Sequence, residues 1–244
     1  MNDLLDVHMH TLASGHAYNT IREMLFAGKK HGLQLVGISD HAPAMPGSTH
    51  KFYFENMRIF NRQVYGAEAG LEVMMGAELN ILNETGKVDL EEKALKSLDY
   101  AIASLHSQCI QPGSKLENTT AVISAMANPY VKIIGHPDNP TYPVDFDALA
   151  KAAKENHVLL ECNNSSYRSH GSRAGSRETA QVMLAACKRY GTHIIMAAMP
   201  ISISTSAITQ VHWRFSLKPI SQKNLSSTHP PRNSRPGSVS EGPP

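Results

Sequence analysis

The sequence predicts an α/β fold whose parallel sheet closes into a barrel, and three observations lead to this expectation. Short apolar runs alternate with longer amphipathic stretches as far as Met196, a pattern typical of repeated strand–helix units. Seven such runs occur, which suits a closed barrel better than a short open sheet. The chain has 244 residues, a size at which α/β barrels commonly form a single domain.

Each apolar run has the length of a strand. We expect strands at residues 4–10, 35–41, 73–82, 100–107, 131–136, 157–163 and 192–196. We expect helices between them, at 19–31, 55–69, 91–98, 117–127, 145–156 and 177–190. Gly32, Gly70 and Gly191 directly follow three of these helical stretches, and a glycine there is typical of a helix C-terminus.

Composition excludes several classes of protein. Hydrophobic residues make up 41% and charged residues 18% of the chain, and the formal net charge is +2. These values indicate a globular protein without the basic excess typical of nucleic-acid binding. No apolar run approaches the roughly 20 residues that cross a bilayer, and the first residues do not resemble a signal peptide. Three scattered cysteines favour a reducing compartment. We expect a cytoplasmic protein that binds neither nucleic acid nor membrane.

Histidine is unusually frequent, with 13 residues in the chain, and many of these histidines lie at predicted strand ends. In a barrel the C-terminal ends of the strands meet on one face, where active sites lie. One such residue alone is most often structural, but His or Glu recurs on five successive strands. The pattern therefore predicts a multinuclear metal site with the candidate ligands His8, His10, His16, His41, Glu78, His106 and His136.

The ligand types narrow the chemistry. Imidazole and carboxylate without thiolate suit zinc, manganese or iron, and paired ions favour displacement at phosphorus by a hydroxide formed at neutral pH. We expect hydrolysis of a small phosphorylated substrate by a metal-bound hydroxide, with no independent general base among the side chains. Weaker candidates to bind substrate phosphate or line the mouth of the site are His50, Arg58, Arg168, His170, Arg173 and Arg177.

The motifs DVHMHTLASGHAY, ISDHAP, GAELN, SLHS and GHPDNP occur in that order and resemble those of the PHP (polymerase and histidinol phosphatase) family, especially its compact YcdX-type phosphatase branch. The resemblance spans residues 3–196. It implies a distorted (β/α)7 barrel that binds three zinc ions, with manganese or iron as alternatives. It implies that His8, His10 and a bridging Glu78 hold the first ion. Glu78, His106 and His136 would hold the second, and His16 and His41 the third.

The sequence departs from this family after the seventh predicted strand. The family completes its ligand set there with the Asp and His of a motif resembling GSDAH, whereas this chain has Met199 and Ile201 at those positions. Neither side chain is a normal ligand for such a site. We therefore expect a barrel that is incomplete at its C-terminal end, fewer than three bound ions and impaired activity.

Residues 197–244 differ in composition from the barrel domain expected at 1–196. More than a third of them are Ser or Pro, and basic residues outnumber acidic ones, which predicts a disordered basic tail. For one choice of codons, GSDAHIDFDIGN with one base lost from its first codon translates as AAMPISISTSAI, the sequence at 197–208. This match leads to the hypothesis that the tail is an out-of-frame translation.

Three alternatives remain open at the level of sequence. The first is another activity of the same family, such as histidinol-phosphate hydrolysis or exonuclease action. The second is a non-catalytic metal-binding protein whose basic tail docks a partner. The third is a non-functional product that aggregates. No oligomeric state is predicted.

Overall fold

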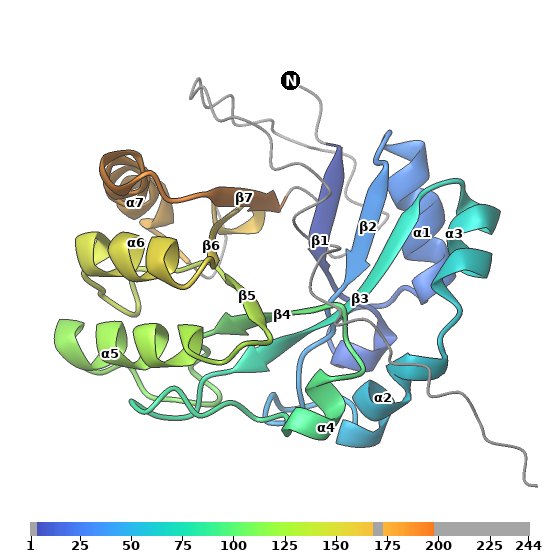
Figure 1. The fold of residues 1–244 in the computed structure, drawn as a ribbon, viewed down its shortest axis with the longest axis horizontal. Coiled ribbons are helices and arrows are strands. Elements are labelled where there is room, and N and C mark those ends of the chain that lie inside the picture. The colour runs from blue at the N-terminus through green and yellow to red at the C-terminus, as the bar shows by residue number, and fades with distance from the viewer. Residues whose placement is uncertain (1–3, 168–172, 198–244) are drawn as a thin grey trace, which may run out of the picture. The chain divides into compact units, whose positions relative to one another are not determined.

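A computed structural model describes residues 4–167 and 173–197, and it confirms the expected α/β barrel (Figure 1). Seven parallel strands form one sheet, and each strand pairs with the next along the chain. The first and last strands lie beside each other, so the barrel is nearly closed. The strands are β1 (Leu5–Met9), β2 (Leu35–Ile38), β3 (Glu72–Asn80), β4 (Tyr100–Ser104), β5 (Val131–Ile134), β6 (Leu159–Asn163) and β7 (Ile194–Ala197).

Helices cover the outer side of this sheet. In Figure 1, α5, α6 and α7 stack on one side and α1 and α3 lie on the other, while the short α2 and α4 pack together below. The α-helices are α1 (Ile21–Lys30), α2 (Lys51–Glu55), α3 (Arg62–Ala69), α4 (Glu92–Leu95), α5 (Lys115–Met126), α6 (Phe146–Glu155) and α7 (Ser176–Tyr190). Three 3-10 turns are η1 (Leu12–Ser14), η2 (Asn56–Ile59) and η3 (Asn164–Tyr167).

Local sequence explains where several helices begin or end. Thr20 and Ser114 each form a capping box, in which the hydroxyl accepts from the third helical amide and a glutamate accepts from the cap amide. Gly70 and Gly191 end α3 and α7 with left-handed φ angles of 70° and 66°, a conformation that glycine adopts without steric cost.

The prediction of one continuous helix over 55–69 was wrong. Glu55 ends α2, η2 follows, and Phe60 is extended with φ −66° and ψ 119°. A new helix, α3, then begins because the Asn61 side chain accepts a hydrogen bond from the Val64 amide at 3.1 Å. An asparagine that binds the backbone locally favours a helix start over a helix interior.

The interior of the barrel is closed by one layer of apolar side chains to which every strand contributes. Tyr100 is a buried member of this layer and donates to the Val7 carbonyl oxygen at 2.6 Å. A Cβ added at Gly37 or Gly76 would lie within 2.5 Å of the Tyr100 side chain, so these two glycines make room for the ring. The other members of the layer are Leu5, Val7, Leu35, Met74, Ile102, Ile133, Leu159 and Ile195.

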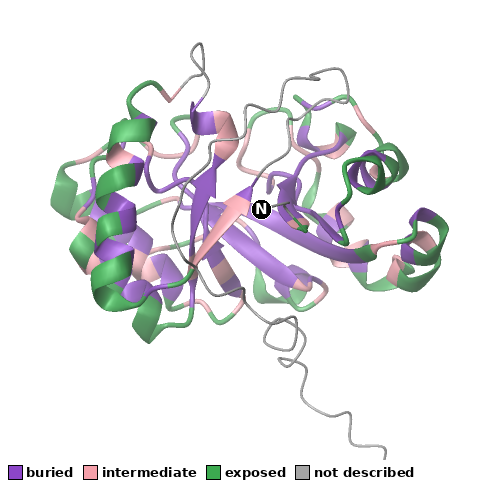
Figure 2. Cartoon of the chain, turned by 90° about the horizontal axis from the view of Figure 1, so that it is seen from above, coloured by how far each residue is buried: buried purple, intermediate pink, exposed green. Residues whose placement is uncertain are grey.

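Burial follows this architecture. In Figure 2 the strands are mostly purple and the outward surfaces of the helices are green. The last strand is less protected, because Ile194, Ile195 and Met196 are only half-buried. Of the tail predicted at 197–244, Ala197 is the last residue of β7 and is buried, and the rest lies outside the described residues. None of the helices within 4–167 and 173–197 combines the length and apolar content that a membrane crossing requires.

Candidate metal centre

Glu78 lies at the centre of the candidate site, with five imidazoles around its carboxylate. The Glu78 side chain is 1% exposed. Its Oε2 lies 3.1 Å from His8 Nε2, 3.4 Å from His10 Nε2 and 2.9 Å from His41 Nδ1. Its Oε1 lies 3.2 Å from His106 Nε2 and 3.0 Å from His136 Nε2. The two oxygens therefore face different sets of histidines.

Seven residues were predicted as ligands, and the structure brings all seven together. Six of them form three overlapping groups of three residues, and within each group the nitrogen or oxygen atoms that could bind a metal all lie within 4.8 Å of one another. His16 belongs to the outermost group and is exposed, whereas the other six residues are buried. The groups are His8–His10–Glu78, His41–Glu78–His106 and His10–His16–His41.

Regular strand alternation explains the positions of three of these residues. On β3, Met74 and Gly76 contact the interior layer, so the period of two turns Glu78 inward as well. On β4, Ser104 donates to Glu78 Oε1 at 2.7 Å, and His106 follows two residues later. His41 pairs with Glu78 in a parallel bridge beyond the end of β2.

His8 is aimed into the site by an irregularity in β1. Leu5 and Val7 pack into the interior layer, so strict alternation would turn His8 away from it. The pairing of β1 with β2 shifts register between Asp6 and Met9, and the His8 amide donates to Asp6 Oδ1 at 3.0 Å. A bulge of this kind re-aims the side chains that follow it, so both His8 and His10 reach Glu78.

His136 is aimed inward by its backbone. A Cβ added at the preceding Gly135 would lie 2.2 Å from Ser104 Oγ and 3.5 Å from Glu78 Oε1, so that position already faces the site. His136 has φ of 34°, a left-handed value that costs a residue with a side chain roughly 1–2 kcal/mol. This conformation brings the His136 ring to Glu78 from the position next to Gly135.

Three of the imidazoles are oriented from behind through Nδ1. His8 Nδ1 lies 2.6 Å from Glu161 Oε1. His10 Nδ1 lies 2.9 Å from Ser14 Oγ, which donates to Asp40 at 2.7 Å. The third is His106, whose Nδ1 lies 2.7 Å from Asn80 Oδ1. Asn80 Nδ2 in turn donates to Asp89 Oδ2 at 2.6 Å. Each of these series of hydrogen bonds ends at a carboxylate, and the Nε2 atom of each ring is directed at Glu78.

This arrangement fits a metal better than it fits a hydrogen-bonded core. Histidines that bind metal ions commonly donate their other ring N–H to a carboxylate or another acceptor, as these three can. His41 Nδ1 is buried and has no hydrogen-bond partner of acceptable geometry, although a carboxylate oxygen lies 2.9 Å away. The donors are nitrogen and oxygen without sulfur, a set that suits zinc, manganese and iron.

Charge is strongly coupled inside the site. Burial disfavours the charged form of Glu78, but the neighbouring His8, His41 and His106 outweigh it and hold the Glu78 pKa well below its usual value. Burial lowers the pKa of His136 to about 3, helped by the charge of Arg173. Burial also holds the pKa of His10 well below its usual value. The neutral form, which burial favours for His10 and His136, keeps the lone pair that binds a metal.

Two buried acids of this site were missed in the sequence. Glu161 is 1% exposed and binds His8, and Asp40 is 1% exposed and accepts from Thr11, Ser14 and Tyr53. Both are charged residues inside or next to predicted apolar strands. The same signal identified Glu78, so it could have found Glu161 in HVLLECN.

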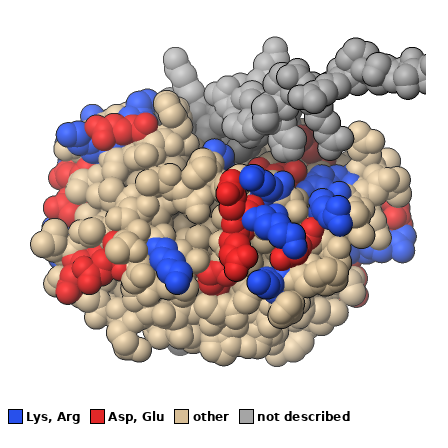
Figure 3. Space-filling view, turned by 60° about the horizontal axis from the view of Figure 1, so that its bottom comes forward, with Lys and Arg blue, Asp and Glu red and all other residues tan. Residues whose placement is uncertain are grey.

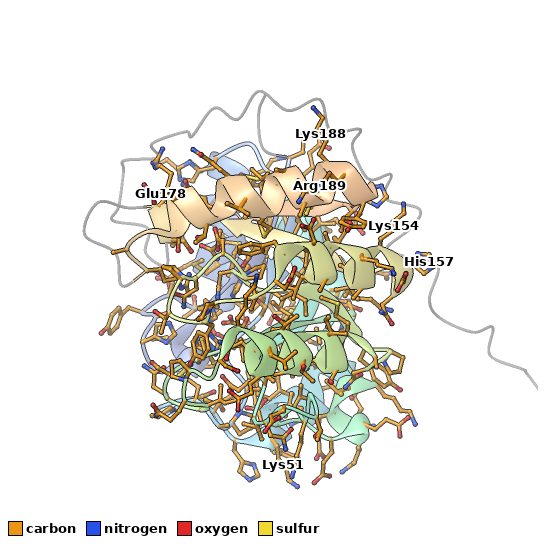
Figure 4. All side chains as sticks on the ribbon, turned by 90° about the vertical axis from the view of Figure 1, so that its left-hand side faces the viewer. Lys51, Lys154, His157, Glu178, Lys188 and Arg189 are labelled. Atoms are coloured by element: carbon orange, nitrogen blue, oxygen red, sulfur yellow. The ribbon has the colours of Figure 1, made fainter. Side chains whose placement is uncertain are left out.

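The weaker candidates are spread over the surface. His50 is exposed and caps α2 through its ring Nδ1. Arg58 and Arg177 are exposed, whereas Arg173 is half-buried and donates to Ser166 Oγ at 3.0 Å. Arg168, His170, Met199 and Ile201 lie outside the described residues. His157 is exposed and points outward near Lys154 (Figure 4).

Charges on the outer surface near α2 and α4 are paired. Lys96 lies 2.9 Å from Glu92, Lys51 lies 3.6 Å from Glu91, and Lys93 binds Glu55. Figure 3 likewise shows acidic and basic side chains next to one another on its face of the molecule. The charges of these described residues therefore form no patch of one sign.

Comparisons with known proteins identify a family and several relatives. The model of the PHP domain family matches residues 6–165. A "probable phosphatase" of Clostridium novyi is 42% identical over 198 residues, which cover 81% of this chain and 79% of that protein. A "probable phosphatase" of Thermoanaerobacter sp. is 45% identical over 199 residues, with the same coverage.

Among solved structures, the histidinol phosphate phosphatase of Lactococcus lactis shares the fold. It is 16% identical, has a TM-score of 0.54, and the match covers 81% of this chain and 88% of that one. That protein was crystallised with zinc, L-histidinol and phosphate.

Proposed function

The chain belongs to the PHP domain family, and on that premise we propose that it hydrolyses small phosphate esters at a site of up to three metal ions around Glu78. Its class is that of the phosphoric ester hydrolases, because relatives at 42–45% identity are phosphatases by name. The observation that carries the proposal is a single buried carboxylate whose two oxygens face five imidazole nitrogens.

The split between the Glu78 oxygens supports a bridging role for this residue. His8 and His10 lie on the Oε2 side and would hold one ion. His106 and His136 lie on the Oε1 side and would hold a second. His16 and His41 would hold a third ion, supported by their grouping with His10.

Zinc is the proposed metal, with manganese or iron as alternatives. The nitrogen and oxygen donors suit all three ions, and the Lactococcus lactis phosphatase that shares this fold contains zinc. When bound, such ions lower the pKa of coordinated water and neutralise charge on a phosphoryl group. The protein's own side chains would fix the ligand rings, exclude water beneath the site and orient the substrate.

Arg173 is the described residue best placed to bind the substrate phosphate. Its guanidinium is half-buried, is fixed by Ser166 Oγ at 3.0 Å, and lies close enough to His136 to lower the pKa of that ring. A guanidinium has five N–H donors and matches the geometry of phosphate oxygens. Arg173 would hold the phosphate next to the His136 side of the site.

We infer that activity is impaired in this chain, because Met199 and Ile201 stand where the family has an Asp and a His ligand. The Asp would complete the first ion site and the His the third. The second ion site keeps Glu78, His106 and His136 and needs neither missing ligand. Metal binding should therefore persist in part while hydrolysis is weakened.

The test measures metal content and hydrolysis in two chains. Zinc and manganese per chain are determined by elemental analysis after gel filtration. Phosphate release is then measured on small phosphomonoesters, including L-histidinol phosphate, with single-stranded DNA as the exonuclease substrate. The second chain has its frame restored so that GSDAH follows residue 196. We expect partial metal content here, full content in the restored chain, and hydrolysis of phosphomonoesters by the restored chain.

Two outcomes would reject this function. A restored chain that binds metal fully but hydrolyses none of the esters would favour a non-catalytic metal-binding protein. Cleavage of DNA with no activity on small esters would favour the exonuclease alternative.

A further inference from the structure

Two histidines of the site depart from the regular alternation of their strands, and Glu161 contacts both of them from the side away from Glu78. His8 follows the register shift of β1, and His136 has the left-handed φ of 34°. Glu161, on β6, lies 2.6 Å from His8 Nδ1 through Oε1 and accepts from the His136 amide at 2.7 Å through Oε2. Each carboxylate oxygen thus serves one of the two re-aimed residues.

Glu161 is positioned for this task by regular strand geometry. Leu159 packs against the interior layer, so the period of two turns Glu161 to the same side. The Glu161 side chain is 1% exposed, and Asn163 Nδ2 lies 3.3 Å from its Oε1. Its carboxylate thus binds His8, the His136 amide and Asn163.

We propose that Glu161 is a positioning residue that aligns the two halves of the metal site by orienting the His8 ring and the His136 backbone together. The inference rests on the proposed metal centre, because His8 and His136 belong to different ion sites in that proposal. Glu161 would act through these two residues and would not touch the substrate.

The chemistry requires a carboxylate at this position. The His136 amide can only donate a hydrogen bond. His8 Nδ1 must also donate if His8 Nε2 is to keep the lone pair that binds a metal. A carboxylate accepts at both oxygens, whereas a carboxamide has one acceptor and one donor group.

Glu161→Gln separates positioning from simple loss of packing. The glutamine oxygen must face the His136 amide, because its NH₂ group cannot accept from that amide. The NH₂ group then faces His8 Nδ1 and donates to it, so Nδ1 loses its proton. Size and shape stay almost unchanged, so we expect the fold to survive.

The experiment uses the full-length chain and two readouts. Ring nitrogen–proton NMR spectra of the metal-free protein, labelled on histidine, report whether His8 Nδ1 carries a proton; a His8→Gln sample assigns the signal. Zinc affinity is measured by competition with a chelator of known affinity. We expect the Nδ1–H signal of His8 to be present in the original chain and absent in Glu161→Gln. We expect zinc affinity to fall about 10- to 100-fold, the usual cost of losing such an outer partner.

Asp99→Asn is the matched control. Asp99 Oδ2 accepts from a backbone amide, that of Met75 at 2.7 Å, and from a side chain, Arg62 Nε at 2.5 Å. It contacts none of the candidate ligands. This variant should lower the unfolding temperature without changing zinc affinity or the His8 signal.

The outcomes separate this inference from the proposed function. Glu161→Gln with unchanged zinc affinity, or with His8 Nδ1 still protonated, overturns the positioning role. An original chain that binds no zinc rejects the metal centre, and the NMR comparison then decides the role of Glu161 alone. If Glu161→Gln lowers only the unfolding temperature, as Asp99→Asn does, Glu161 is merely structural.

Discussion

The ends of β1–β5 and the ends of β6–β7 contribute differently to the candidate site. The first five strands and their loops supply every described side chain that approaches Glu78. β6 supplies Glu161, which binds His8 and the His136 backbone. β7 supplies Ile194, Ile195, Met196 and Ala197, none of which is a metal ligand. In the proposed function, metal binding therefore depends mainly on the first region and full activity on both.

The largest expected effect is that of Glu78→Gln, which would remove the central metal ligand proposed at the ends of β1–β5. A carboxamide cannot bridge two ions as a carboxylate does, so we expect most bound metal to be lost. In the frame-restored chain, kcat/KM should fall on the order of 10³-fold, as for loss of a major electrostatic group. Elemental analysis and phosphate release measure both effects. Exposed Glu155→Gln is the control, and full metal content in Glu78→Gln would contradict the central role of this residue.

Restoring the family's ligands after β7, in the second region, should have the next largest effect. With GSDAH in place after residue 196, we expect kcat/KM to rise more than about 100-fold, beyond the usual cost of an outer-shell partner, because two direct ligands return. A restored chain in which that Asp is again Met should lose most of the gain. Equal activity in the original and restored chains would show that the departure at Met199 and Ile201 is harmless.

Arg173→Ala, made in the restored chain, tests whether the segment after β6 binds the substrate phosphate. Hydrogen bonds to charged groups contribute about 1.5–3 kcal/mol, so KM should rise at least about tenfold. Zinc affinity should not change. Arg189→Ala, which removes an exposed arginine of α7 that pairs with Asp147, should leave KM unchanged. If both variants behave alike, Arg173 does not bind the phosphate.

Ser14→Ala tests the metal side of the first region. Ser14 Oγ connects His10 Nδ1 to Asp40 and also accepts from the His41 amide at 3.0 Å. We expect zinc affinity to fall about tenfold, at the lower end for an outer partner, with KM unchanged. Arg173→Ala should raise KM and leave zinc affinity unchanged. The reverse result for Ser14→Ala would therefore separate metal binding from substrate binding. Ser107→Ala, at an exposed serine, provides the control.

The smallest effects should come from the two capping boxes, one on each side of the sheet in Figure 1. Thr20→Ala on α1 and Ser114→Ala on α5 each remove a cap worth about 1 kcal/mol. For a domain of this size that lowers the unfolding temperature by roughly 2–4 °C. Calorimetry should show one transition lowered equally by both changes. Two separate transitions would mean that the two sides unfold independently.

Much of the fold could be predicted from the sequence because its signals are local. Apolar runs marked the seven strands, and glycines marked the ends of α3 and α7. The break between α2 and α3 was missed, since a capping asparagine inside an amphipathic stretch differs little from an exposed helical residue. The seven candidate ligands could be singled out because His or Glu recurs at strand ends.

What the sequence determined by itself was the strand and helix pattern and the kinds of donor atom at one end of the barrel. The tertiary structure decided how those donors are aimed. The register shift of β1, the left-handed backbone of His136 and the contact between His8 and Glu161, 153 residues apart, all depend on how strands pair. Local propensity does not encode such pairing, because it arises only when distant segments pack together around one core.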